Sequence, residues 1–291
     1  MARAARRRSM PVVRSSRRLR NVTGAWRRRG WTIGFVPTMG AIHEGHLSLV
    51  RRARAAAERV VASIFVNPLQ FGLHEDYRRY PRPEQRDRRL LREAGVDLLW
   101  LPRIEDLYPP GHLTRVRVAE LSEVLEGASR PGHFEGVTTV VAKLLNEVAP
   151  DELWLGQKDA QQALIIERMV ADLDLQVRVR RAPIVREPDG LALSSRNAYL
   201  SSADRRQAVA LARGLGAVRR LLREGERSGA RLRAAVRRVW REYPAVREDY
   251  VAVVDAHTLR PLQVVRGRVL VAVAARVGPA RLIDNLEWSV R

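Results

Sequence analysis

Two histidines in the stretch VPTMGAIHEGHLSLV, His43 and His46, are the first residues of this chain whose type and spacing could do chemistry. Metal binding would be suggested by the zinc-peptidase pattern HExxH, in which the histidines are four apart on one face of a helix. Here they are three apart, Gly45 separates Glu44 from His46, and no downstream cluster supplies a third ligand. The spacing therefore favours a different use for the two imidazoles.

The residues around the histidines predict a strand, a tight turn and a helix. The apolar run 31–36 is followed by Pro37, and apolar residues recur at helical spacing from His46 onward. Glycine lets backbone N–H groups approach a ligand, and a helix N-terminus favours an anion. We therefore expect residues 39–46 to bind phosphate, with the imidazoles donating hydrogen bonds to it. A glycine turn with surface histidines is the plainer alternative.

The composition limits the classes of function. A chain of 291 residues can form one large domain or two smaller ones. It contains no cysteine, which excludes disulfides and thiolate chemistry and is consistent with a cytoplasmic location. No apolar run reaches the ~18 residues of a membrane span, so we expect no membrane partner.

The formal charge of +21 makes a nucleic-acid-binding protein an alternative from a different class. Of the 53 basic residues, however, only Lys143 and Lys158 are lysines, which indicates coding bias towards arginine. The arginines are scattered along the chain, and few aromatic residues lie among them to stack on bases. We expect no nucleic-acid partner, and a DNA titration at physiological salt tests this.

The N-terminal segment is the most basic part of the chain, with no acidic residue before Glu44. Such a leader can be a transit peptide. We favour a short disordered extension, residues 1–9, because it has no apolar run to order it and the folded pattern begins soon after Met10. A variant that starts at Met10 should then keep its activity and its melting temperature.

The hydrophobic pattern divides the chain into two domains, 1–184 and 185–291. In the first, strands alternate with helices, which predicts an α/β fold with a Rossmann-like parallel sheet. The predicted strands are 31–36, 60–66, 96–101, 151–156 and 175–180. The predicted helices are one from His46 and those at 84–95, 136–148 and 160–173. Ligands of such sheets bind beyond the carboxyl ends of the strands.

The second domain has a different pattern, which predicts a smaller α+β domain. Its helical stretches are 203–225 and 231–243, and its strands are 249–256, 268–277 and 281–288. We expect it to act as a lid, so that ATP would reduce proteolysis near 186–197.

Five blocks of sequence, taken in order, resemble one enzyme family. They are PTMGAIHEGH, FVNPLQFG, RPGHFEGV, LGQKDAQQ and PIVREPDGLALSSRN. HxGH alone occurs across the nucleotidylyltransferase superfamily, but the five blocks together resemble the pantoate–β-alanine ligases (pantothenate synthetases), from about residue 11 to the C-terminus. Another nucleotidylyltransferase with a different acceptor is the alternative, and NPLQFG and GHFEGV argue against it.

The resemblance implies ATP-dependent condensation of (R)-pantoate with β-alanine through a pantoyl adenylate, with release of AMP and pyrophosphate. It also implies Mg²⁺ brought by ATP, and a homodimer. His46 matches the family's proton donor. The residues that match its ATP-binding segments are Met39, Gly40, Ala41, Ile42, His43, Glu44, Gly45, His46, Gly156, Gln157, Lys158, Asp159, Val185, Leu193, Ser194, Ser195 and Arg196.

The resemblance assigns the remaining site residues to the two acids and the metal. Gln70 matches a glutamine that contacts pantoate and β-alanine, and Gln162 matches a pantoate-binding glutamine. The catalytic set it suggests is His43, His46, Lys158, Ser194, Ser195 and Arg196. Asp87 is the candidate protein ligand for magnesium, with a surface salt bridge as the alternative. Arg130 and His133 are further candidates for an anion contact.

Overall fold

The computed structural model describes residues 9–72 and 75–290. The predicted extension 1–9 thus lies outside the described residues except for Ser9. The chain forms two compact units. The first comprises Met1–Ser122, Arg130–Gln157 and Gln162–Pro183; the second comprises Glu123–Ser129, Lys158–Gln161 and Ile184–Arg291. Two short stretches that our sequence-based division assigns to the first domain, 123–129 and 158–161, therefore belong to the second unit.

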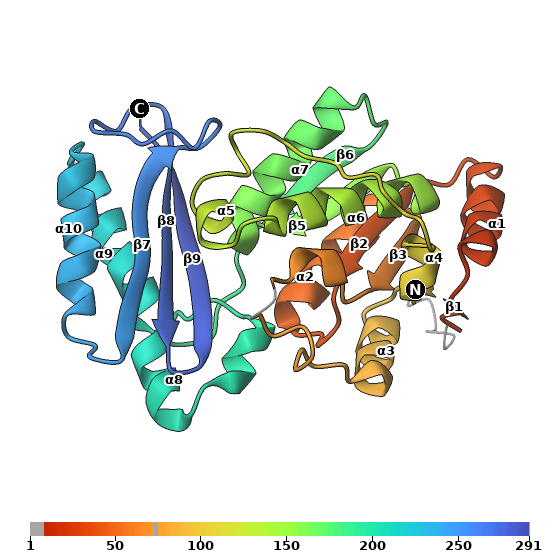
Figure 1. The fold of residues 1–291 in the computed structure, drawn as a ribbon, viewed down its shortest axis with the longest axis horizontal. Coiled ribbons are helices and arrows are strands. Elements are labelled where there is room, and N and C mark those ends of the chain that lie inside the picture. The colour runs from red at the N-terminus through yellow and green to blue at the C-terminus, as the bar shows by residue number, and fades with distance from the viewer. Residues whose placement is uncertain (1–8, 73–74, 291) are drawn as a thin grey trace, which may run out of the picture. The chain divides into compact units, whose positions relative to one another are not determined.

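The first unit is built on a six-stranded parallel sheet in the order β1-β4-β3-β2-β5-β6, which confirms the predicted Rossmann-like α/β fold (Figure 1). The strands are β1 (Val12–Val13), β2 (Ile33–Thr38), β3 (Arg59–Ile64), β4 (Leu98–Trp100), β5 (Glu152–Gly156) and β6 (Arg178–Ala182). The helices are α1 (Ser16–Arg27), α2 (Glu44–Ala56), α3 (Glu84–Glu93), α4 (Ile104–Leu107), α6 (His133–Val148) and α7 (Ala160–Asp172). Short 3₁₀ turns, η1 (Pro68–Gln70) and η2 (Gln157–Asp159), follow β3 and β5.

The strand order reverses between β2 and β5. From β2 the chain continues through β3 and β4 to one side of the sheet, and through β5 and β6 to the other. Ligands of open parallel sheets bind at this switch point, beyond the carboxyl ends of the strands. The segments that leave β2 and β5 there are 39–46 and 156–157, which hold the first predicted site residues.

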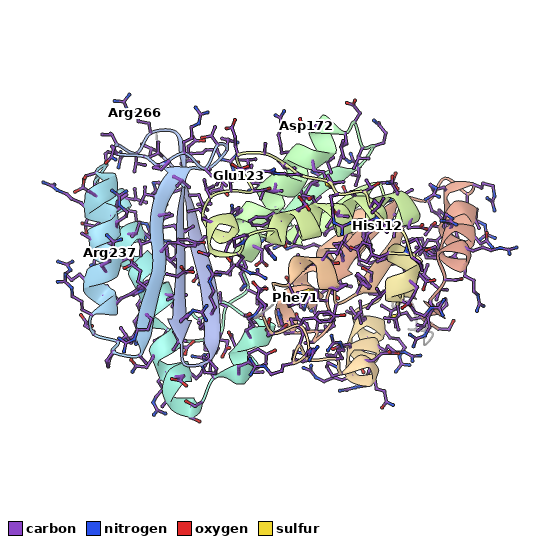
Figure 2. All side chains as sticks on the ribbon, in the orientation of Figure 1. Phe71, His112, Glu123, Asp172, Arg237 and Arg266 are labelled. Carbon is purple, nitrogen blue, oxygen red and sulfur yellow. The ribbon has the colours of Figure 1, made fainter. Side chains whose placement is uncertain are left out.

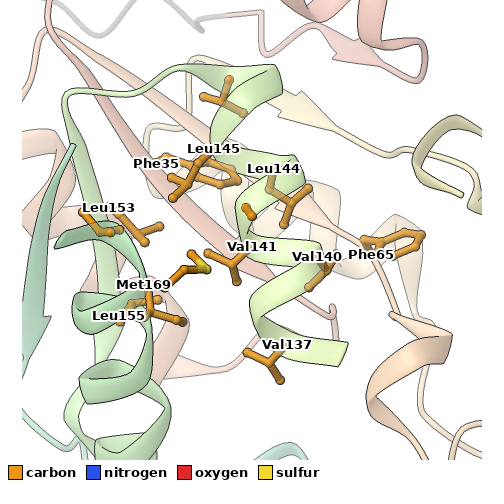
Figure 3. Close-up of a cluster of buried hydrophobic side chains, with 14 of the residues drawn as sticks. Phe35, Phe65, Val137, Val140, Val141, Leu144, Leu145, Leu153, Leu155 and Met169 are labelled. Carbon is orange, nitrogen blue, oxygen red and sulfur yellow. The ribbon is translucent and has the colours of Figure 1, made fainter. Parts of the chain in front are cut away.

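The main core of the first unit fixes these strands against helices α6 and α7 (Figure 3). Phe35 of β2 and Leu153 of β5 pack with Val141 and Leu145 of α6 and Met169 of α7. Full burial of each such side chain contributes about 1.5–3 kcal/mol. A second apolar cluster places α2 and α3 on the opposite face of the sheet. The strand ends that carry the predicted site are thereby held from both faces.

The second unit contains a three-stranded antiparallel sheet, β7 (Val246–Asp255), β8 (Arg268–Val277) and β9 (Ala280–Ser289), with β8 in the middle. Helices α9 (Ala210–Arg223) and α10 (Gly229–Trp240) pack on it through a core of their own. The unit also contains α5 (Glu126–Ser129), the 3₁₀ helix η3 (Ser195–Tyr199) and α8 (Ser202–Ala208). The predicted smaller α+β domain is confirmed.

Local predictions differ from the structure in several places, of which the following are examples. Strand β2 continues through Pro37 to Thr38. Proline lacks an N–H, but it is tolerated at position 37 because β5 pairs with β2 only at Gly34 and Phe35, so that no strand on that side needs a donor there. The predicted helix 203–225 is two helices, α8 and α9, which meet at Val209. Helix α1, which carries many arginines and few apolar residues, was not predicted.

Side chains project from the helices and strands of both units (Figure 2), and many of the arginines pair with nearby carboxylates. Arg237 of α10 binds Glu248 of β7 through two guanidinium nitrogens, and Arg20 of α1 binds Glu147 of α6 at 2.7 Å. Such pairs are typical of a solvated surface and contribute little individually. Within residues 9–72 and 75–290, no helix is both long enough and apolar enough to cross a membrane.

Candidate active site

The turn between β2 and α2 is organised by His43 and His46. His43 is the N-cap residue of α2, in an extended conformation, and its Nδ1 accepts a hydrogen bond from Gly45 N at 3.1 Å. His46 Nδ1 accepts from His43 N at 3.4 Å, and the two rings stack with centroids 4.1 Å apart. The pair thus forms a capping box in which imidazoles take the places usually held by serine and glutamate.

This capping arrangement determines which ring nitrogen of each histidine is the donor. A nitrogen that accepts a hydrogen bond carries no proton, so each neutral imidazole holds its proton on Nε2. His46, the predicted proton donor, would then donate through Nε2. Two Nε2–H donors at a helix N-terminus are well suited to bind phosphate oxygens.

Gly45 is needed for this arrangement because the His43 ring folds over it. A Cβ atom at position 45 would lie 2.8 Å from Cε1 and 2.9 Å from Nδ1 of His43. Cβ atoms do not tolerate such distances, so any side chain at 45 would displace the ring. The glycine between the histidines therefore serves packing of the imidazole and not a positive φ angle.

Asp87 of α3 holds the same turn from the other side. Its side chain is 1% exposed, and its two oxygens accept from Ala41 N and Ile42 N, each at 2.8 Å. Burial raises the pKa of this carboxyl, and the two N–H donors oppose that rise only in part. The surface salt bridge considered for Asp87 is wrong, because the residue is buried and bound to backbone.

In the described part of the chain, no group of three or more His, Asp or Glu residues could hold a metal ion.

Gln70 lies at the end of the η1 turn after β3 and is nearly buried. Its Oε1 accepts from Asn67 Nδ2 at 3.1 Å, and its Nε2 donates to Met39 Sδ at 3.1 Å. Asn67 also donates to Gly136 O at 3.0 Å, which ties η1 to helix α6. The structure thus brings Gln70 together with Met39 of the predicted ATP segment. A thioether is a weak acceptor, so a substrate oxygen can take this donor.

The backbone of Gln70 is held by the RPGHFEGV block. His133 Nδ1 donates to Gln70 O at 2.8 Å, which leaves Nε2 to accept from Arg130 at 3.0 Å. Arg130 in turn binds both oxygens of Glu75, at 2.7 and 2.5 Å. Burial alone would raise the pKa of Glu75, but the hydrogen bonds and charge of Arg130 outweigh it and lower that pKa. Arg130 and His133 support Gln70 in this structure.

Gly136 of the same block permits the close approach of α6 to the Gln70 turn. A Cβ atom there would lie 2.3 Å from Leu69 O and 2.6 Å from Gln70 N. Because both neighbours are backbone atoms, neither can move aside without displacing η1. The second glycine of the GHFEGV block is thereby explained by its packing against the Gln70 turn.

The second unit carries the predicted ATP residues from Lys158 onward. Lys158 lies in the η2 turn with its Nζ 3.5 Å from Asp159 Oδ1, and its carbonyl oxygen accepts from Asn285 Nδ2 at 2.9 Å. The lysine side chain is 20% exposed and the aspartate 47%. The two side chains therefore form an ion pair at the partly exposed η2 turn.

The segment Val185–Arg196 forms a hairpin followed by a turn. Leu193 N donates to Val185 O at 3.0 Å, and Glu187 N donates to Leu191 O at 2.8 Å. Ser194 then caps η3, because its Oγ accepts from Arg196 N at 3.3 Å. The hydroxyls of Ser194 and Ser195 and the guanidinium of Arg196 thus come immediately after the hairpin in the chain.

Several supporting residues were not identified from the sequence. Asn67 and Glu75 hold the predicted site residues Gln70 and Arg130 through side-chain hydrogen bonds. On strand β9, Asp284 holds Arg186, which follows the predicted Val185, and Asn285 holds Lys158. The signal for Asp284 and Asn285 was a pair of polar residues within the apolar pattern RLIDNLEW. Gly156 ends β5 and Gln157 begins η2, whereas Gln162 lies in the first turn of α7; all three belong to the first unit.

Comparison with known proteins gives consistent matches over nearly the whole chain. The family model described as Pantoate-beta-alanine ligase matches residues 11–287. A pantothenate synthetase from Moorella thermoacetica is 53% identical over 281 residues, which cover 97% of this chain and 99% of the relative. The crystal structure of pantothenate synthetase from Thermus thermophilus has a TM-score of 0.91 at 50% identity, and the match covers 95% of this chain and 99% of that one.

A second solved structure provides ligands. It is a pantoate-beta-alanine ligase from Francisella tularensis complexed with Beta-gamma ATP and β-alanine. It matches with a TM-score of 0.77 at 34% identity, over 96% of this chain and 97% of that one.

Proposed function

Because the chain belongs to the pantoate–β-alanine ligase family, we propose that it joins (R)-pantoate to β-alanine at the expense of ATP. It is a ligase of pantothenate biosynthesis. The observation that carries the proposal is the family match over residues 11–287, together with the imidazole capping box at the N-terminus of α2. The relative crystallised with Beta-gamma ATP and β-alanine supports the same two substrates for this chain.

The chemistry requires activation of a carboxylate. A carboxylate oxygen of pantoate attacks the α-phosphorus of ATP, the bond to the bridging oxygen breaks, and pyrophosphate leaves. The β-alanine amine then attacks the acyl carbon of the pantoyl adenylate, loses a proton and expels AMP. No protein nucleophile takes part, so catalysis consists of positioning and of stabilising charge on phosphate oxygens.

We infer the following roles for the site residues of the first unit. His46 Nε2–H donates to the departing pyrophosphate, and His43 donates to a neighbouring phosphate oxygen. Asp87 holds the N–H groups of the turn in position. Gln70 supplies an amide donor to pantoate and β-alanine, and Gln162 binds pantoate. Both glutamines suit hydroxy and carboxylate groups because an amide donates and accepts.

In the second unit we infer contacts to the phosphates of ATP. Lys158 is a compact cation with three rotatable donors, and Ser194, Ser195 and Arg196 add two hydroxyls and a planar cation. Asp159 orders Lys158 or binds ribose. The lid role of residues 185–291 stays a prediction, to be tested by proteolysis with and without ATP.

Magnesium enters with ATP as part of the substrate and neutralises charge on its phosphates. That Asp87 is its ligand stays a prediction, and the two backbone bonds of its carboxylate favour the positioning role. A homodimer and a cytoplasmic location are likewise predictions. Sedimentation at micromolar concentration tests the first, and a single 33.0 kDa species would refute it.

The test is an assay of all products with each substrate omitted in turn. We expect pantothenate, AMP and pyrophosphate in equal amounts, and pyrophosphate release that depends on pantoate. A nucleotidylyltransferase with another acceptor would give no pyrophosphate in response to pantoate. Formation of ADP in place of AMP would also contradict the proposal.

A further inference from the structure

Two segments with predicted ATP residues are fastened to consecutive residues of strand β9. Asn285 Nδ2 donates to Lys158 O at 2.9 Å, across a sequence separation of 127 residues. Asp284 binds Arg186 through both oxygens, at 2.6 and 2.9 Å. Residues 158–161, the hairpin after Val185 and strand β9 all belong to the second unit.

The Asp284 contact closes the hairpin that precedes Ser194. The carboxylate is 2% exposed, and Arg186 uses the same guanidinium to donate to Gly190 O at 2.9 Å. Asp284 Oδ1 also accepts from Asn285 N at 2.8 Å. A buried carboxylate with bidentate arginine and backbone donors is a strong attachment, and removal of one partner would leave a buried charge unpaired.

The Asn285 contact acts on the backbone of Lys158 and not on its ammonium group. Asn285 is 5% exposed, so its amide is sequestered from bulk water. Alternation along the strand places Asp284 on the face with Leu282 and Leu286, which belong to the apolar core, and Asn285 on the other face. One strand therefore attaches a different segment on each face.

The start of α7 is held at a second point. Gln161 Nε2 donates to Val124 O at 2.8 Å, and its Oε1 accepts from Glu126 N at 3.0 Å. Glu126 binds Arg281 of β9, at 2.6 and 2.8 Å. The stretch 158–161 is thus fixed at Lys158 by Asn285 and at Gln161 by a segment that β9 also holds.

From these contacts we propose that Asp284 and Asn285 are positioning residues of the adenylation step, with Asn285 setting the position of Lys158. The proposal rests on the proposed function, because it gives Lys158 a role at the phosphates of ATP. The side chain at position 285 must be an amide donor of the length of asparagine. Alanine would lose the hydrogen bond to the Lys158 carbonyl, and aspartate would keep the shape but present a second acceptor to that carbonyl. Displacement of a positioned group by about 1 Å can lower a rate by up to ~10²-fold.

The test is a double-mutant cycle read by pantoate-dependent pyrophosphate release at varied ATP. Asn285→Ala should lower kcat by about 10-fold, within the range for a displaced catalytic group. Asn285→Asp should lower it at least as much, although its volume is unchanged. In a Lys158→Ala background the same changes should have less than about 2-fold further effect, because coupled residues are not additive.

Leu286→Val is the matched control, since it perturbs the next residue of β9 on the core face. It should lower the melting temperature without changing kcat. If circular dichroism shows that Asn285→Ala does not fold, Asn285→Asp serves as the second variant. A fully active Asn285→Asp enzyme, or equal losses in the wild-type and Lys158→Ala backgrounds, would overturn the proposal. Normal activity of Lys158→Ala would overturn it too, whereas a wild-type enzyme without pantoate-dependent release would instead refute the proposed function.

Discussion

The turns at 39–46 and 157–159 both carry residues predicted to bind ATP, but they are positioned in different ways. In the first, the imidazoles are set by hydrogen bonds that span two and three residues of sequence. In the second, Lys158 is set by Asn285, 127 residues further along the chain. The imidazoles are thus set locally at a helix N-terminus, although Asp87 of α3 holds the turn before them. The position of Lys158 depends instead on a strand at the far end of the second unit's sequence.

This difference has a consequence for how each turn responds to change. The first turn should be sensitive to substitutions within its own few residues, and the second to substitutions on a distant strand. The side chains that we propose to face ATP are polar and few, whereas Asp87 and Asn285, which hold the two turns, are buried. Substitutions at the contacts that hold each turn can therefore test the two arrangements separately.

The largest effect is expected at Lys158. Arginine fills nearly every other basic position of this chain, so a retained lysine suggests a need for a compact cation with three rotatable donors. Lys158→Arg should lower pantoate-dependent pyrophosphate release at least ~10²-fold, as for loss of one aligned donor. Lys143→Arg on α6 is the control and should change the rate by less than about 2-fold. Activity of Lys158→Arg within a few-fold of wild type would show that the lysine was retained by chance.

A smaller effect is expected at Gly45, where the local cap is most crowded. Gly45→Ala puts a methyl group 2.8 Å from the His43 ring and must displace it. We expect a roughly 10-fold loss of adenylation, in the range for a displaced catalytic group. Melting temperature should change little, because the helix preference of alanine over glycine offsets the loss of the His43 cap.

Gly216→Ala is the matched control for Gly45, because position 216 also lies in a helix but has nothing within 4 Å of an added Cβ. It should raise stability without changing activity. If Gly45→Ala were as active as Gly216→Ala, the imidazole cap would have no part in catalysis.

The smallest effect concerns Glu75, which supports the Gln70 turn through Arg130. Its pKa is lowered from the ordinary value of 4.5, so the ionised form stabilises the fold. That stabilisation is present above pH 4.5 and is lost as the pH falls through the lowered pKa. Glu75→Gln should cost roughly 1 kcal/mol of unfolding free energy at pH 7. In urea titrations its difference from wild type should shrink below about pH 4; a difference independent of pH would mean that charge is not involved.

The sequence predicted the first turn better than the second, for physical reasons. Periodicity located the strand, the glycine turn and the helix around His43 and His46, because each is a local pattern. It could not show that the histidine Nδ1 atoms cap the helix, since that depends on side-chain rotamers. For Asp87 the sequence suggested a magnesium ligand or a surface salt bridge, because its charged neighbours hid its burial against Ala41 and Ile42.

Long-range polar contacts were the part that sequence reasoning could not reach. Asn285 and Asp284 lie in a strand that was predicted, yet nothing in their spacing pointed to Lys158 or Arg186. The same holds for the segment 123–129, which joins the second unit through Glu126 and Arg281. Local patterns specify elements, whereas partners far apart in the sequence require the fold.

Isotope exchange between pyrophosphate and ATP tests the central claim most directly, because it reports reversible formation of the pantoyl adenylate alone. We predict exchange that requires pantoate and proceeds without β-alanine. His46→Ala and Lys158→Ala should each lower it about 10²–10³-fold, as expected for loss of one donor to the transition state. Substitution of the exposed His257 to alanine is the control and should leave the exchange unchanged. Exchange that requires β-alanine, or that persists in both site variants, would contradict the account.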